Sequence, residues 1–176
     1  MTARLLLAAA AAATVLLPAS APAQPRQYGY EEIASDLAYG FCPLFLAGQF
    51  PLNSPQLAER GFATAVQKQQ DPRYGELQMV TLERADGEIV FGGAAGKVCS
   101  VILGGGKRGA ALAKLRETMS WTGLDFKPAA NHVAAPAGVK LETFRADSGG
   151  QALYVQLIEA EQPAPMVIAQ LFVMDK

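Results

Sequence analysis

The two cysteines, Cys42 and Cys99, are the residues whose chemistry the sequence constrains most. They form no C-x-x-C motif, which is the spacing of a thiol–disulfide redox site. A structural zinc site would need further nitrogen or sulfur ligands, and His132 is the only histidine. The pattern therefore predicts one structural disulfide between Cys42 and Cys99, and it predicts no metal and no cofactor. The chain-entropy model gives such a bridge an upper value of roughly 4 kcal/mol.

The four residues Asp147-Ser148-Gly149-Gly150 are similar to part of the sequence around the nucleophile of trypsin-like serine proteases. That family has Gly before the Asp, where this chain has Ala146, and its two-barrel domain is much longer than this chain. The required histidine would have to be His132, which lies in a connector rich in Pro and Ala. Because Asp, Ser and Gly favour turns, we expect these four residues to form a hairpin turn and do not assign them to the active site of a trypsin-like protease.

Lys107 and Arg108 follow the run Gly104-Gly105-Gly106, between a predicted strand and a predicted helix. The free amides at a helix N-terminus can bind an anion, so these two cations are the candidates for an anion site. The run lacks the G-x-x-x-x-G-K-[ST] spacing of a phosphate-binding loop. A triple glycine is more often a flexible joint between a strand and a helix, which is the simpler interpretation.

Residues 1–23 have the three parts of a cleavable signal peptide. Arg4 is the positive region, Leu5 to Leu17 is the apolar region, and Ala21-Pro22-Ala23 supplies small residues where a signal peptidase cuts. We expect cleavage after Ala23. The competing interpretation is an uncleaved membrane anchor, but the apolar run of about 13 residues is shorter than the roughly 20 that span a bilayer. The sequence therefore predicts a bacterial protein exported to the periplasm or the medium, with no stable membrane anchor after cleavage.

The mature chain, residues 24–176, is predicted to be a single domain, with residues 24–29 as a flexible lead-in. Its length suits one hydrophobic core but not two domains of ordinary size. The formal net charge of −1 gives no electrostatic reason to expect nucleic acid as a partner.

Two blocks of strands are predicted by apolar and β-branched runs between turn residues. The first block comprises residues 76–83, 88–91 and 97–103, with a hairpin turn at residues 85–87. The second comprises residues 139–145, 151–159 and 166–174. The last of these is apolar on both faces, which predicts an interior strand. The two blocks can form one continuous antiparallel sheet.

Helices are predicted around these blocks from the 3.6-residue apolar period. The first begins at Tyr30 and must kink or restart at Pro43. A short second helix begins at Pro55, with Ser54 capping its first amides. The third covers about residues 109–121, with a buried stripe and with Trp121 packing at its end. We therefore predict an α+β fold with two layers, in which an antiparallel sheet of about six strands has the helices packed on one face.

The helical Phe41-Cys42, the strand Val98-Cys99-Ser100-Val101 and the leucine-containing helix that follows resemble features of small exported proteins of proteobacteria. Those proteins have a signal peptide and no assigned activity. The resemblance implies export and a pair of cysteines, one in a helix and one in a strand. It carries over no catalytic residues.

The sequence favours a non-enzymatic binding or interaction module in the periplasm or medium. Its binding surface would be the sheet face, a sheet edge or the groove beside the first helix. The expected partner is another envelope protein, or a small apolar or peptide ligand. Two alternatives stay open: a small exported hydrolase that uses dispersed carboxylates or Ser148 near His132, and an accessory protein of envelope assembly or stress.

Overall fold

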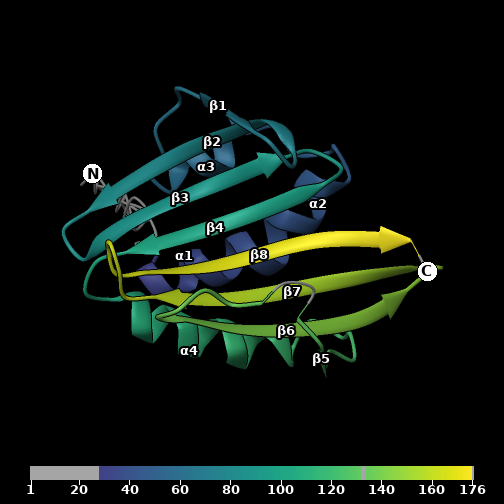
Figure 1. Ribbon diagram of the computed structural model, residues 1–176. Helices are drawn as coiled ribbons and strands as arrows, with labels where there is room; N and C mark the ends of the chain where they lie inside the picture. The colour runs from purple at the N-terminus through teal and green to yellow at the C-terminus, as the bar shows by residue number, and fades with distance from the viewer. Residues whose placement is uncertain (1–27, 132–133, 176) are drawn as a thin grey trace, which may run out of the picture.

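The fold is built on one antiparallel sheet with the strand order β1-β2-β3-β4-β8-β7-β6-β5 (Figure 1). The computed structural model describes residues 28–131 and 134–175. The strands are β1 (Gln67–Asp71), β2 (Gly75–Arg84), β3 (Gly87–Ala94), β4 (Val98–Gly104), β5 (Lys127–Ala129), β6 (Val139–Ser148), β7 (Gln151–Ala160) and β8 (Met166–Asp175). The helical elements are α1 (Tyr30–Asp36), the π-helical turn η1 (Leu37–Phe41), α2 (Cys42–Leu46), α3 (Pro55–Glu59) and α4 (Arg108–Met119).

Two meanders, β1–β4 and β5–β8, join where β4 pairs with β8. Helix α4 connects the two meanders in the chain, and the register at the junction places Cys99 opposite Leu171 and Val101 opposite Ala169. Strand β8 therefore has neighbours on both sides, which confirms the predicted interior strand and the continuous antiparallel sheet.

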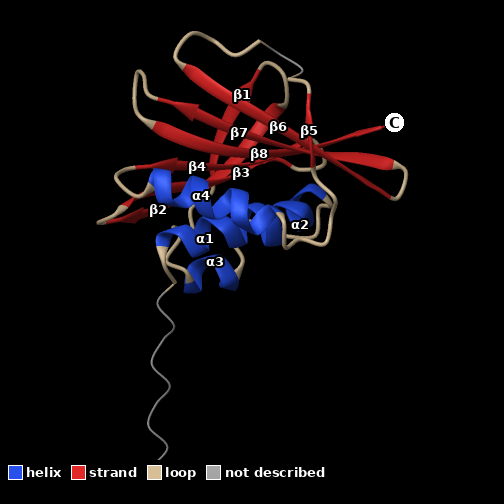
Figure 2. Ribbon diagram, turned by 90° about the horizontal axis from the view of Figure 1, so that it is seen from below, coloured by secondary structure: helices blue, strands red, loops and turns tan. Residues whose placement is uncertain are grey.

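The helices lie together on one side of the sheet (Figure 2). Alternate residues of the strands point to that side and are almost fully buried, as expected for a sheet with one covered face. These buried strand residues include Val80, Leu82, Ile89, Phe91, Val101, Leu103, Val155, Leu157, Val167, Ala169 and Leu171. From the helices, the predicted stripe Leu112, Leu115 and Met119 joins the same core.

The prediction of about six strands is wrong, because the sheet of the described residues has eight. Strand β1 is the polar edge strand Gln67–Asp71, most of whose side chains are exposed. Its residues do not alternate between apolar and polar, and backbone pairing with β2 does not require any particular residue type. Strand β5 has three residues, including Pro128, and forms the opposite edge, where a missing N–H is tolerated.

Strand β3 continues through Gly92 and Gly93, beyond the predicted end of this strand at residue 91. A Cβ on Gly92 would lie 2.1 Å from the carbonyl oxygen of Gln78, and one on Gly93 would lie 2.1 Å from that of Val98. Both residues also have a positive φ, of 146° and 150°. The glycines are therefore required by the close approach of β2 and β4 on either side of β3.

The first helix is interrupted before Pro43, as predicted. The interruption is the π turn η1, in which the Cys42 N–H donates to the carbonyl oxygen of Leu37, five residues earlier. Pro43 has no N–H and its ring crowds the preceding turn, so a wider turn there satisfies the backbone at low cost.

Two details of the helices were predicted wrongly. Ser54 stands at the N-cap of α3, but its hydroxyl makes no capping hydrogen bond and is buried without a partner. Trp121 lies beyond the end of α4 at Met119 and is 64% exposed. Trp121 therefore falls after the last helical turn and does not extend the buried stripe of α4.

The predicted Cys42–Cys99 disulfide is confirmed, with a Cα–Cα distance of 5.5 Å. Both cysteines are fully buried, and the bond joins the start of α2 to the central strand β4. A disulfide of this kind fits an oxidising compartment. The predicted signal peptide, its cleavage site after Ala23, and His132 lie outside the described residues. Within the described ranges, no helix has the length and apolarity needed to cross a membrane.

Replacing Gly92 with Ala should lower the free energy of unfolding by roughly 1–3 kcal/mol, because the added Cβ meets the backbone of β2. The matched control is Gly109→Ala on α4, where nothing lies within 4 Å of the new Cβ. That change should raise stability by roughly 0.5–1 kcal/mol. Urea unfolding of both variants measures the difference, and equal effects would contradict the assigned packing of β3.

Removing the disulfide with the double variant Cys42→Ala/Cys99→Ala should lower the free energy of unfolding by roughly 2–4 kcal/mol, because the unfolded chain regains the entropy of a long loop. Guanidinium unfolding of the oxidised protein and of the double variant tests this. A loss below about 1 kcal/mol would show that core packing alone holds α2 on the sheet.

Candidate functional site

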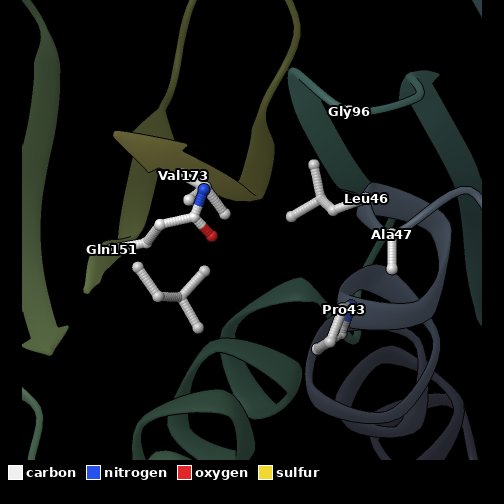
Figure 3. Close-up of a pocket in the computed structure, with 7 residues that line it drawn as sticks. Pro43, Leu46, Ala47, Gly96, Gln151 and Val173 are labelled. Atoms are coloured by element: carbon white, nitrogen blue, oxygen red, sulfur yellow. The ribbon is translucent and has the colours of Figure 1, made fainter. Parts of the chain in front are cut away.

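A partly open apolar pocket lies between α2 and the ends of β7 and β8 (Figure 3). Its volume is about 390 Å³. The lining residues are Pro43, Leu46, Ala47, Gly96, Gln151, Leu153 and Val173. Figure 3 shows Leu46 on one side and Val173 and Gln151 on the other, with their side chains directed toward the space between them. The pocket therefore lies at the end of the helix layer, where it meets the sheet.

The disulfide and the strand register position the two walls of this pocket. Pro43 directly follows Cys42, whose bond to Cys99 fixes the start of α2 on β4. In the opposite wall, Leu153 and Val173 are register partners on β7 and β8, on the side of the sheet that faces the helices. Neither wall can move far without breaking the disulfide or the strand pairing.

The described lining side chains are mostly apolar. None of the lining residues that the structure describes has a titratable side chain, and the amide of Gln151 is the one polar side chain among them. That amide can both donate and accept a hydrogen bond. The described lining can thus hold an apolar group and orient a neighbouring polar group. In the part of the chain that the structure describes, no cluster of three or more His, Cys, Asp or Glu could hold a metal ion.

A second surface is the side of the sheet that faces away from the helices. A row of register partners crosses six strands there, and all its members are half-buried. In spatial order the row is Thr81, Val90, Ile102, Ile168, Ile158 and Leu141. We call it the apolar row. A continuous strip of half-buried side chains suits contact with another molecule.

A polar row runs beside the apolar row on the same face. Gln170 Nε2 donates to Ser100 Oγ at 3.3 Å, and Gln156 Nε2 donates to Thr143 Oγ1 at 3.2 Å. Thr143 Oγ1 in turn donates to Asn131 Oδ1 at 2.8 Å, which ties the segment after β5 to this face. These side chains hydrogen-bond to one another, so the polar row holds the side chains of this face in place.

The anion-site candidates Lys107 and Arg108 lie at the start of α4, beside carboxylates. Lys107 Nζ is 3.5 Å from Glu31 Oε1, and Arg108 Nη2 is 3.2 Å from Glu161 Oε2. An anion would have to compete with both carboxylates. The anion site stays a prediction, and no other cation joins these two in the ion pairs described here.

Ser148 is the last residue of β6, and Gly149 and Gly150 form the turn to β7 with positive φ. The predicted hairpin turn is therefore present, although it begins later than expected. The side chain of Ser148 and the whole of His132 lie outside the described residues. The hydrolase that would pair them stays a hypothesis.

Tyr30, which is buried, and Tyr39, which is half-buried, are phenols that hold helices in place. The Tyr30 hydroxyl lies 2.9 Å from the carbonyl oxygen of Glu88 and 2.8 Å from that of Gly104. The Tyr39 hydroxyl donates to the carbonyl oxygen of Leu115 at 2.9 Å. Burial, followed by the negative charges of nearby carboxylates, raises the pKa of Tyr30 to about 12, and burial raises the pKa of Tyr39 above its ordinary value. Because both phenols bond to backbone, we assign them structural roles.

The sequence anticipated only one wall of the α2 pocket. The predicted binding surfaces included a groove beside the first helix, but no sequence signal indicated that Leu153 and Val173 would face that helical region. The apolar row was also missed. Its signal was present in the outward residues of each strand, and only the strand register aligns them.

Comparisons with protein-family models, with curated proteins and with solved structures found no match. The resemblance to small exported proteins of proteobacteria thus stays a prediction, and function rests on the chemistry of the surfaces described above.

Alkaline pH should destabilise the protein as Tyr30 ionises. Its folded-state pKa of about 12 exceeds the ordinary 10.0, so the stability that it contributes is complete below pH 10.0 and is lost as pH rises toward about 12. Urea unfolding from about pH 9 to about pH 12 should show this decline. Tyr30→Phe should be less stable at neutral pH and should decline less steeply above pH 10.0. If the stability of Tyr30→Phe declines with pH as steeply as that of the unaltered protein, the role assigned to Tyr30 is contradicted.

Proposed function

We propose that this protein is an exported, non-enzymatic binding module of the periplasm or medium that takes an apolar group in the α2 pocket. The observation that carries the proposal is a pocket whose described lining side chains are apolar except for a single amide. The buried disulfide supports an oxidising location outside the cytoplasm.

The size and polarity of the pocket define the class of ligand. About 390 Å³ falls within the range of small-molecule sites, so the pocket fits the apolar part of a small ligand or one large side chain of a peptide. The amide of Gln151 can hydrogen-bond an ester, amide or peptide group attached to that apolar part. The described lining contains no cationic side chain that would recognise a carboxylate or phosphate. Neutral acyl or peptide ligands are therefore favoured.

Ala47→Phe should weaken binding by about tenfold or more, because the added ring occupies the space that the ligand needs. Ala47 is exposed and lines the pocket, so the change leaves the core intact. The probe is N-octanoyl-glycinamide, titrated into the full chain and followed by amide chemical shifts. We expect shifts at residues 43–47, 96, 151–153 and 173. The matched control is Ala58→Phe on α3, an exposed helical alanine outside the pocket lining.

Two outcomes of this titration would count against the α2 pocket. One is a set of shifts confined to other residues. The other is equal binding by Ala47→Phe, Ala58→Phe and the unaltered chain.

A second candidate function is recognition of another exported protein, as an accessory of envelope assembly or stress. The apolar row favours it, since a strip across six strands offers a partner a broad surface and not an enclosed site. Amide shifts caused by such a partner would fall on the row and its neighbours, while residues 43–47 would stay unshifted.

A further inference from the structure

Trp121 is the single tryptophan of the chain, and it is 64% exposed. It lies in the turn after α4, where its backbone N–H donates to the carbonyl oxygen of Thr118. The ammonium group of Lys114 lies 4.6 Å from the centre of its ring. The indole is thus held by a cation–π contact while most of its surface stays open to solvent.

This indole borders a shallow pocket of about 340 Å³ between α1 and α4. Its lining residues are Tyr28, Glu32, Ser35, Asp36, Lys114, Thr118 and Trp121. None of them lines the α2 pocket, so the two sites are separate. The lining differs in kind as well, because it combines an exposed aromatic ring with charged groups of both signs.

The charged groups keep hydrogen-bonding capacity. Asp36 uses Oδ2 for Arg60 at 3.3 Å, and its side chain is 48% exposed. Glu32 Oε2 accepts a hydrogen bond from the N–H of Gly29 at 3.1 Å. Lys114 Nζ pairs with Glu117 Oε2 at 3.1 Å, which leaves it further donors. Acceptors on α1 therefore face the same space as a donor on α4.

We propose that this pocket binds a neutral sugar ring, with the C–H face of the sugar against Trp121 and its hydroxyls bonded to Asp36, Glu32 and Lys114. A sugar has both an apolar face and hydroxyls that donate and accept, which matches an open indole beside groups of both signs. Two carboxylates disfavour an anionic ligand. Lys114 already supplies a cation to the ring, which disfavours a cationic one. The proposal stands independently of the function proposed for the α2 pocket.

Intrinsic fluorescence tests this directly, because Trp121 is the only tryptophan. The full oxidised chain is titrated with cellotriose, maltotriose and the trisaccharide of N-acetylglucosamine. We expect at least one of them to shift the emission in a saturable way. Free octanoyl-glycinamide, the probe for the α2 pocket, should leave the emission unchanged, so failure of one proposal is distinguishable from failure of the other.

Saturation-transfer NMR then measures binding of the active trisaccharide to variants. Trp121→Ala and Asp36→Asn should each weaken binding by about tenfold or more. Leu44→Ala is the control, since Leu44 is a 41% exposed apolar residue outside this pocket. Equal unfolding midpoints in urea would show that Trp121→Ala is folded.

Three results would overturn the proposal. The first is emission that none of the three sugars changes. The second is a shift caused by a lysine-rich peptide and by no sugar, which would make the surface a peptide site. The third is unchanged sugar binding by Trp121→Ala.

Discussion

The Cys42–Cys99 disulfide joins the helix layer of this protein covalently to the sheet. Cys99 lies on β4, the strand through which the two meanders join, and Cys42 begins α2. The π turn before α2 redirects the helix at Pro43, so helical continuity alone would not hold α2 on the sheet. The covalent bond fixes it there, and the wall formed by Pro43, Leu46 and Ala47 follows from that constraint.

Sequence patterns predicted the parts of the fold in which burial dictates residue type. Val80 and Leu82 alternate with polar residues in β2, and both are buried as the period of two requires. The edge strand Gln67–Asp71 was missed because backbone pairing holds it, and pairing needs no apolar side chain. The predicted strand 88–91 ends before Gly92, because glycine in a strand usually weakens it. Here it permits the close approach of a neighbouring strand, which is a tertiary requirement that local sequence does not reveal.

The candidate sites were less predictable than the fold, since each is assembled from distant segments. Leu46 belongs to the first helical region, whereas Val173 comes from the last strand, and only the folded sheet brings them to one pocket. The apolar row depends in the same way on register, because Ile102 and Ile168 are neighbours through the β4–β8 pairing. Trp121 was predicted to pack at the end of its helix and is largely exposed. In each case the residue type was visible in sequence, and its neighbours were not. The resulting surfaces offer apolar contact and hydrogen bonds, which suits binding.

Native mass spectrometry of the protein recovered from the envelope of its own host tests the central claim, that the α2 pocket binds an apolar group, most directly. The account predicts a chain with its disulfide intact and an added mass that leaves on denaturation and partitions into organic solvent. The Ala47→Phe variant should lack that mass, and the Ala58→Phe variant should retain it. A chain without added mass, or an added mass that Ala47→Phe retains in full, would contradict the account.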